Sequence, residues 1–160
     1  MVFGGRACQK PGAAKNTLNH MEQRDILKKQ IEQIGKLLGK ILARFTGLKT
    51  AENISEAIQV TNRELQKELG LDIDNLVNLN APELENQLKT INLTEHHLDQ
   101  LSHYFFEIGS YHKANGNDAD AHHFFSTALK IVDLADKKSS TFTFDRLKLK
   151  EQIYAITVNE

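Results

Sequence analysis

The sequence has few of the residues that cross-link or bend a chain. Its 160 residues include a single cysteine, Cys8, so no disulfide can form within the chain, and a reducing, cytoplasmic compartment is the expected location. Proline, which breaks helices by removing a backbone donor, occurs only at Pro11 and Pro82. No run of about 18 apolar residues is present, so we expect no membrane-spanning segment. These absences favour long helices in a water-soluble protein.

The sequence signatures of catalysis are also missing. There is no glycine-rich phosphate loop, no nucleophile elbow of the Gly-x-Ser-x-Gly type and no Cys-x-x-Cys pair. No base-reading motif is present either, and the middle of the chain is acidic, which disfavours a nucleic-acid partner. We therefore expect a protein that is not an enzyme, carries no cofactor and does not bind nucleic acid.

Charge is unevenly distributed, although the formal net charge is only −1. Residues 22–49 carry seven Lys or Arg and three Asp or Glu, whereas residues 50–135 carry five and fourteen. A basic and an acidic segment attract each other, within one chain or between two chains. The same pattern also arises when solvated faces simply differ in charge, so both interpretations stay open.

The first 20 residues show no helical periodicity. They are mostly small or polar and lack the apolar core of a secretion signal. We predict that residues 1–20 are a disordered tail, or an extension outside the native protein that begins at Met21. Residues 21–160 are then expected to form a single helical domain.

The strongest pattern predicts a helix over residues 22–46. Its apolar residues alternate between spacings of four and three, which is an unbroken heptad seam. The seam consists of Leu27, Ile31, Ile34, Leu38, Ile41, Phe45 and Leu48. Further apolar residues widen the stripe, which favours packing in a bundle, and a homodimer formed through this helix is the alternative. Gly35 and Gly39 suggest that another backbone comes close, and Gly47 is expected to end the helix.

Capping signals place the remaining helices. Asn53 is a cap for a helix that ends before Gly70, so residues 22–70 should form an antiparallel helical hairpin. Asn80 and Thr94 are caps for two later helices, the second of which reaches about residue 115. We predict an all-α bundle of five to seven helices.

The segment 102–133 carries a resemblance to a known family. Aromatic and small residues recur at the gaps of a tetratricopeptide repeat, at Phe105, Ile108, Gly109, Gly116, Ala121, Phe125 and Ala128. This segment resembles one tetratricopeptide (TPR-like) helix hairpin. The resemblance implies close helix crossing at Gly109 and Ala121, a turn at Gly116, and a TPR-like C-terminal half over residues 81–157. The whole chain resembles, more faintly, uncharacterised bacterial helical proteins.

The resemblance also implies a binding groove on the first helix of the hairpin. His103, Phe106, Ser110 and Lys113 are three or four residues apart and share one helical face. A phenylalanine between a histidine and a lysine suits a peptide that carries apolar and acidic groups. We therefore predict a protein-protein interaction or scaffold module that binds a peptide or helix through these four residues. In the alternative interpretation Phe106 belongs to the core and the other three are solvated.

The predicted helix that follows Thr94 also carries a histidine-rich face. His96, Asp99, His103 and Glu107 lie on one face of the same predicted helix, and these residue types can ligate Zn²⁺. Helix-borne zinc sites need a further ligand from a second element, and no His-Glu-x-x-His motif is present. We assign no metal ligands, and a metal-dependent enzyme ranks below the interaction module and the homodimer.

Overall fold

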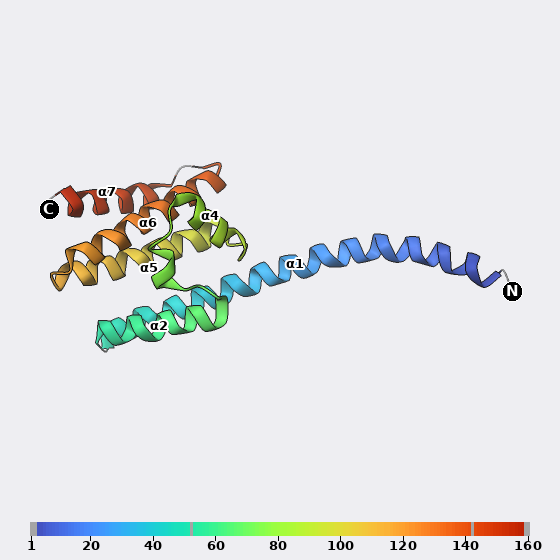
Figure 1. Cartoon of the computed structure of the whole chain (residues 1–160), viewed down its shortest axis with the longest axis horizontal. Coiled ribbons are helices and arrows are strands. Elements are labelled where there is room, and N and C mark those ends of the chain that lie inside the picture. The colour runs from blue at the N-terminus through green and yellow to red at the C-terminus, as the bar shows by residue number, and fades with distance from the viewer. Residues whose placement is uncertain (1–2, 52, 142, 159–160) are drawn as a thin grey trace. The chain divides into compact units, whose positions relative to one another are not determined.

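The computed structural model describes residues 3–51, 53–141 and 143–158, with side-chain environments from Gln23 onward. Within these residues there are seven helices and no strand, so the predicted all-α fold is confirmed (Figure 1). The helices are α1 (Phe3–Ala51), α2 (Ile54–Leu69), α3 (Ile73–Leu76), α4 (Ala81–Lys89), α5 (Glu95–Ala114), α6 (Asp118–Lys138) and α7 (Phe144–Val158). None of these described helices has the length and apolar character needed to cross a membrane.

The chain divides into two compact units, one ending at Gln33 and one beginning at Ile34. In the first unit the backbone is helical from Phe3, whereas the sequence predicted disorder for residues 1–20. That prediction relied on the lack of apolar periodicity. The assignment of residues 1–20 as a tail separate from the helical domain stays a prediction.

The second unit begins with the C-terminal part of α1 and with α2, which runs back beside it (Figure 1). From α1, Leu38, Ile41 and Phe45 are buried. From α2, the buried stripe consists of Ala57, Ile58, Thr61 and Leu65. The Asn53 side chain caps α2, and Gly70 ends it with a φ of 69°, a left-handed conformation that glycine adopts without strain. The predicted cap at Asn53 and the predicted helix end at Gly70 are therefore present.

Helix α1 extends to Ala51, past Gly47, where the sequence predicted its end. The last turns have partners elsewhere in the fold, because Lys49 Nζ lies 3.0 Å from Glu107 Oε2 of α5. At Gly35 the structure brings a side chain close, where the sequence predicted a backbone. A Cβ atom added there would lie 2.1 Å from Nε2 of His97, so the small residue makes room for the first turn of α5.

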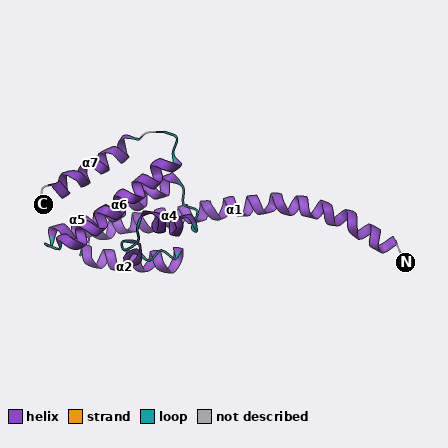
Figure 2. Cartoon of the chain, turned by 45° about the horizontal axis from the view of Figure 1, so that its top comes forward, coloured by secondary structure: helices purple, strands orange, loops and turns teal. Residues whose placement is uncertain are grey.

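Helices α5 and α6 form the hairpin around which the second unit packs, and α5, α6 and α7 lie side by side (Figure 1). Gly109 and Ala121 are buried, and a Cβ atom added at Gly109 would lie 2.8 Å from the ring of Phe125. Gly116 reverses the chain with a φ of +80°. The antiparallel crossing expected at these small residues is present, and Figure 2 shows the two helices running together along their length.

Helix α7 closes the other side of α6, burying Leu149 and Ile153. It begins at Phe144. The side chain of Phe144 is 80% exposed, so it does not fill the end of the bundle.

Candidate functional site

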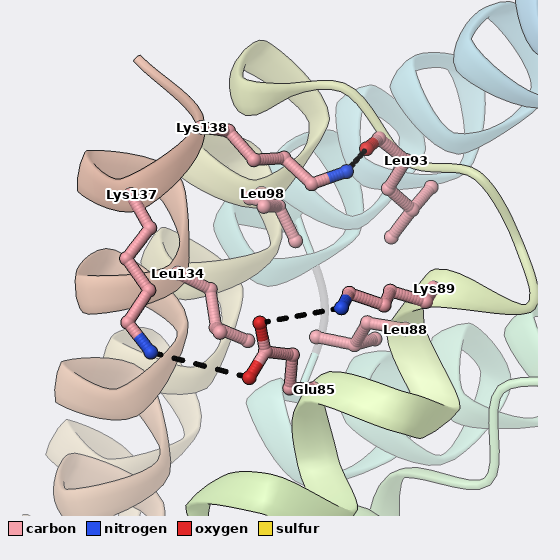
Figure 3. A pocket seen from close by; sticks show the side chains of 8 residues that line it. All are labelled: Glu85, Leu88, Lys89, Leu93, Leu98, Leu134, Lys137 and Lys138. Atoms are coloured by element: carbon pink, nitrogen blue, oxygen red, sulfur yellow. Dashed lines mark hydrogen bonds and ion pairs between the residues drawn. The ribbon is translucent and has the colours of Figure 1, made fainter. Parts of the chain in front are cut away.

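A pocket of about 180 Å³ lies where α4, the loop after it, the first turns of α5 and the last turns of α6 meet (Figure 3). We call it the lysine-rimmed pocket. Its lining residues are Glu85, Leu88, Lys89, Leu93, Leu98, Leu134, Lys137 and Lys138. They come from three helices and one loop, so the pocket exists only in the folded chain.

Local capping forms the α4 side of the pocket. Asn80 accepts a hydrogen bond from Glu83 N, and the Glu83 carboxylate accepts one from Asn80 N, so the start of α4 is fixed by a capping box. The chain then turns at Asn92, whose φ of 58° is a left-handed conformation that asparagine tolerates. This turn directs Leu93 into the core before Thr94 caps α5.

Four leucines form the floor of the pocket. Leu88, Leu93 and Leu98 are at most 3% exposed, and Leu134 is 8% exposed. Their side chains belong to the core cluster and face the interior of the pocket (Figure 3). An apolar group that enters the pocket would therefore contact leucine on several sides and leave water.

Charged residues form the rim. The Glu85 carboxylate lies between two lysines, with Oε1 3.6 Å from Lys89 Nζ and Oε2 4.0 Å from Lys137 Nζ (Figure 3). Lys138 Nζ donates a hydrogen bond to the Leu93 carbonyl at 2.8 Å. The rim thus carries three cations against one anion. The side chains of Lys89 and Lys137 are 62% and 68% exposed, and ion pairs this exposed contribute roughly 0–1 kcal/mol, so an incoming carboxylate can compete for them.

The volume decides what class of ligand fits. Pockets for cofactors and drug-sized molecules occupy roughly 300–1,000 Å³. At about 180 Å³, the lysine-rimmed pocket suits a single apolar side chain or a group of similar size. A short apolar anchor with acidic groups beside it matches both the floor and the rim.

The four residues predicted to form the groove lie in different environments. His103 is exposed and lines two hollows, one of about 130 Å³ against α1 and one of about 200 Å³ against α7. Phe106 is half-buried, packs on the core, and has its ring 5.7 Å from that of Phe125. Ser110 is half-buried, and Lys113 Nζ lies 3.4 Å from Asp118 Oδ1. A shared groove formed by these four residues stays a prediction.

The histidine-rich face is already supplied with protein cations. Asp99 accepts two hydrogen bonds from Arg146, at 2.7 Å and 3.1 Å, and Glu107 pairs with Lys49. Among the described residues, no group of three or more His, Cys, Asp or Glu is arranged to hold a metal ion. The carboxylates of Asp99 and Glu107 therefore neutralise an arginine and a lysine.

Arg146 links three helices at this face. Its side chain is 5% exposed and also reaches Asp136 of α6 at 3.3 Å, so one guanidinium of α7 joins α5 and α6. The hydrogen bond with Asp99 raises the pKa of Arg146, and the one with Asp136 adds to this effect. The guanidinium therefore stays charged and holds α7 in place at all ordinary pH values.

Sequence reasoning missed the lysine-rimmed pocket. Lys137 and Lys138 follow directly on the last buried turn of α6. Basic residues at a helix end usually complement the helix dipole, so their pattern alone indicates no site. The missing information was that α4 packs beside the end of α6.

No family model, no curated protein and no solved structure matches this chain. The tetratricopeptide resemblance of residues 102–133 is therefore a prediction that no relative tests.

Proposed function

We propose that this protein is an interaction module that binds a peptide through the lysine-rimmed pocket. The peptide carries one apolar side chain, such as leucine or phenylalanine, with aspartate or glutamate beside it. The observation that supports this proposal most strongly is the combination of a four-leucine floor with three lysines and one glutamate on the rim. The proposed partner is still a peptide with apolar and acidic groups, as expected from the sequence. The proposed binding site, however, lies at the junction of α4 and α6 and not on α5.

The energetics favour a weak, reversible interaction. Burying one leucine or phenylalanine side chain contributes about 1.5–3 kcal/mol. Exposed charge pairs at the rim add roughly 0–1 kcal/mol each. These contributions sum to at most about 6 kcal/mol, so a single anchor of this kind gives a dissociation constant of about 0.1 mM or weaker, and tighter binding would require contacts beyond the pocket.

The test is a titration of ¹⁵N- and methyl-labelled protein with a capped peptide in which one leucine lies between aspartates. We expect saturable shifts in the resonances of Leu88, Leu93 and Lys137. A peptide with lysines in place of the aspartates should bind more weakly. Equal binding of the two peptides, or shifts confined to other parts of the fold, would contradict the proposal.

A charge-reversal variant sharpens this test. Lys137→Glu should weaken binding of the acidic peptide by roughly threefold to tenfold, because it replaces an attraction at the rim by a repulsion. Lys148→Glu, the same change at an exposed position of α7, is the matched control and should leave the affinity unchanged. Since Lys137 is 68% exposed, neither variant should disturb folding.

A homodimer through α1 is a second candidate, and it is favoured by one observation. Ile26 and Leu27 are 54% and 47% exposed, which leaves apolar surface on this part of the helix. Leu38, Ile41 and Phe45 are buried within the chain itself, so a dimer would use only the N-terminal part of the predicted seam. Light scattering, which measures the mass of the particle in solution, distinguishes a dimer from a monomer. A dimer that Leu27→Glu converts to a monomer would support it, and a monomer at high concentration would remove it.

A further inference from the structure

The Glu85 carboxylate already occupies part of the cationic rim of the lysine-rimmed pocket. Glu85 lies on α4 one turn before Lys89 and reaches Lys137 of α6, and its two oxygens divide between these two ammonium groups. Figure 3 shows the carboxylate between the two lysines, beside the side chains of Leu88 and Leu134. It therefore stands where an acidic group of a bound peptide would have to lie in order to pair with the same two lysines.

The fold holds Glu85 at this position. The capping box of Asn80 and Glu83 fixes the start of α4, two residues before Glu85. Within the helix, a glutamate four residues before a lysine is the favourable order for an ion pair. The Glu85 side chain is 31% exposed, about half as exposed as that of either lysine. Because it is tethered in place, Glu85 competes with a partner's carboxylate at a high effective concentration.

Lys138 differs from the other two lysines of the rim. Its ammonium group donates a hydrogen bond of 2.8 Å to the carbonyl of Leu93, which keeps it at the edge of the pocket (Figure 3). It forms no ion pair with a carboxylate in the described part of the chain. An ammonium group has three N–H donors, so two remain for a ligand. Of the three cations that line the pocket, Lys138 is thus the one that a peptide carboxylate can approach without displacing Glu85.

We propose that Glu85 is an internal competitor that limits the pocket to one acidic group of the partner, which Lys138 receives. This inference rests on the proposed function, since it concerns the same pocket and the same class of peptide. Glu85 neutralises Lys89 and Lys137, so a second carboxylate of the peptide would meet negative charge on that side of the opening. The preferred partner segment then has an apolar anchor and a single acidic neighbour.

A set of capped peptides tests this inference in the full-length protein. Leucine is flanked by two asparagines, by one aspartate on either side, or by two aspartates. For the wild type, one aspartate in the preferred position should raise the affinity roughly threefold to tenfold, and a second should change it by less than about twofold. Titration of the labelled protein, followed by nuclear magnetic resonance, measures each affinity.

Two variants test the roles of the individual charged residues. In Glu85→Gln, which keeps the shape of the side chain, the second aspartate should raise the affinity roughly threefold to tenfold, because the two lysines that Glu85 neutralises become available. In Lys138→Gln, the first aspartate should lose its effect. Glu68→Gln and Lys148→Gln, the same changes at exposed positions of α2 and α7, are the matched controls and should bind as the wild type does. An amide spectrum of each variant establishes that the fold is intact.

The outcomes separate this inference from the proposed function. If the wild type gains equally from both aspartates, or if Glu85→Gln binds the two-aspartate peptide no more tightly than the wild type, the inference is overturned while the proposed function stands. An equal gain of Glu85→Gln for the two-asparagine peptide would also overturn it, because the shape of the pocket and not its charge would have changed. If no peptide of the set produces saturable shifts at the leucines of the floor, the proposed function fails and the inference fails with it.

Discussion

The heptad seam of α1 continues through both units of the chain, but its two portions have different surroundings. Leu27, in the first unit, is 47% exposed, whereas Leu38 and Phe45, in the second, are 0% and 3% exposed. The residue spacing is the same in both portions. The difference lies in the neighbours, since Phe45 meets Tyr104 of α5 edge to face, with ring centroids 4.9 Å apart. Periodicity therefore specifies a helix and its apolar stripe, and tertiary packing decides which part of the stripe becomes core.

The largest expected effect on stability comes from truncating a buried residue of the seam, compared with truncating an exposed one. Phe45→Ala should lower the free energy of unfolding by about 3–5 kcal/mol, because it leaves a cavity beneath Tyr104. Leu27→Ala, a truncation in the same seam, should change it by at most about 0.5 kcal/mol. Urea denaturation of both variants measures the difference. Comparable losses would show that the exposed portion of the seam is also covered in solution.

The second prediction compares two glycines that approach α5 or lie in it. Gly109→Ala should destabilise the fold by about 1–3 kcal/mol, since the ring of Phe125 lies 2.8 Å from the new Cβ and is itself held in the core. At Gly35 the obstacle is the end of the His97 side chain, which can rotate away. The gain in helix propensity of about 1 kcal/mol then offsets much of the cost of Gly35→Ala. Thermal unfolding of the two variants distinguishes a fixed neighbour from a movable one.

The third prediction concerns Phe106, the central residue of the groove expected from the sequence. Its half-buried ring packs against Phe125, so Phe106→Ala should cost about 1–2 kcal/mol of stability, less than a fully buried phenylalanine. Phe144→Ala, at a side chain that is 80% exposed, is the matched control and should be neutral. If Phe106→Ala leaves the melting temperature unchanged but weakens peptide capture, the groove predicted on α5 is supported as the binding site.

The smallest expected effect is an alkaline loss of stability through Tyr104. Burial raises the pKa of this phenol well above its ordinary value, and the charge of Asp74 adds to the rise. Above about pH 10 the unfolded chain releases this proton while the folded chain retains it, so stability falls with a slope of up to about 1.4 kcal/mol per pH unit. Below pH 10 both states keep the proton and the effect vanishes.

Tyr104→Phe should remove this contribution. The free energy of unfolding of the variant should therefore fall less steeply than that of the wild type between about pH 10 and 11. Tyr154→Phe, at a side chain that is 54% exposed, should leave the slope unchanged. Identical slopes for Tyr104→Phe and the wild type would show that the phenol ionises in the folded state.

Much of the fold could be predicted from the sequence because its signals are local. The caps at Asn53, Asn80 and Thr94 require only neighbouring backbone groups, and the structure places each at a helix start. The crossing of α5 and α6 was predictable for a related reason. Gly109 and Ala121 are small where space is short, and the turn that brings them together lies between them in the chain.

The candidate site could not be predicted in the same way. Glu85 and Lys137 form one rim, but the two are separated by more than forty residues of sequence. Charged residues at such distances carry no shared periodicity. The contact between Arg146 and Asp99 could not be predicted either, since nothing near Arg146 in the sequence indicates that it would pair with Asp99.

The most direct test of the interaction proposal is a measurement of intermolecular nuclear Overhauser effects with the bound aspartate–leucine–aspartate peptide. The proposal predicts contacts between the peptide leucine methyls and the methyls of Leu88, Leu93, Leu98 and Leu134. Contacts to His103 and Phe106 instead, with none to these four leucines, would contradict it.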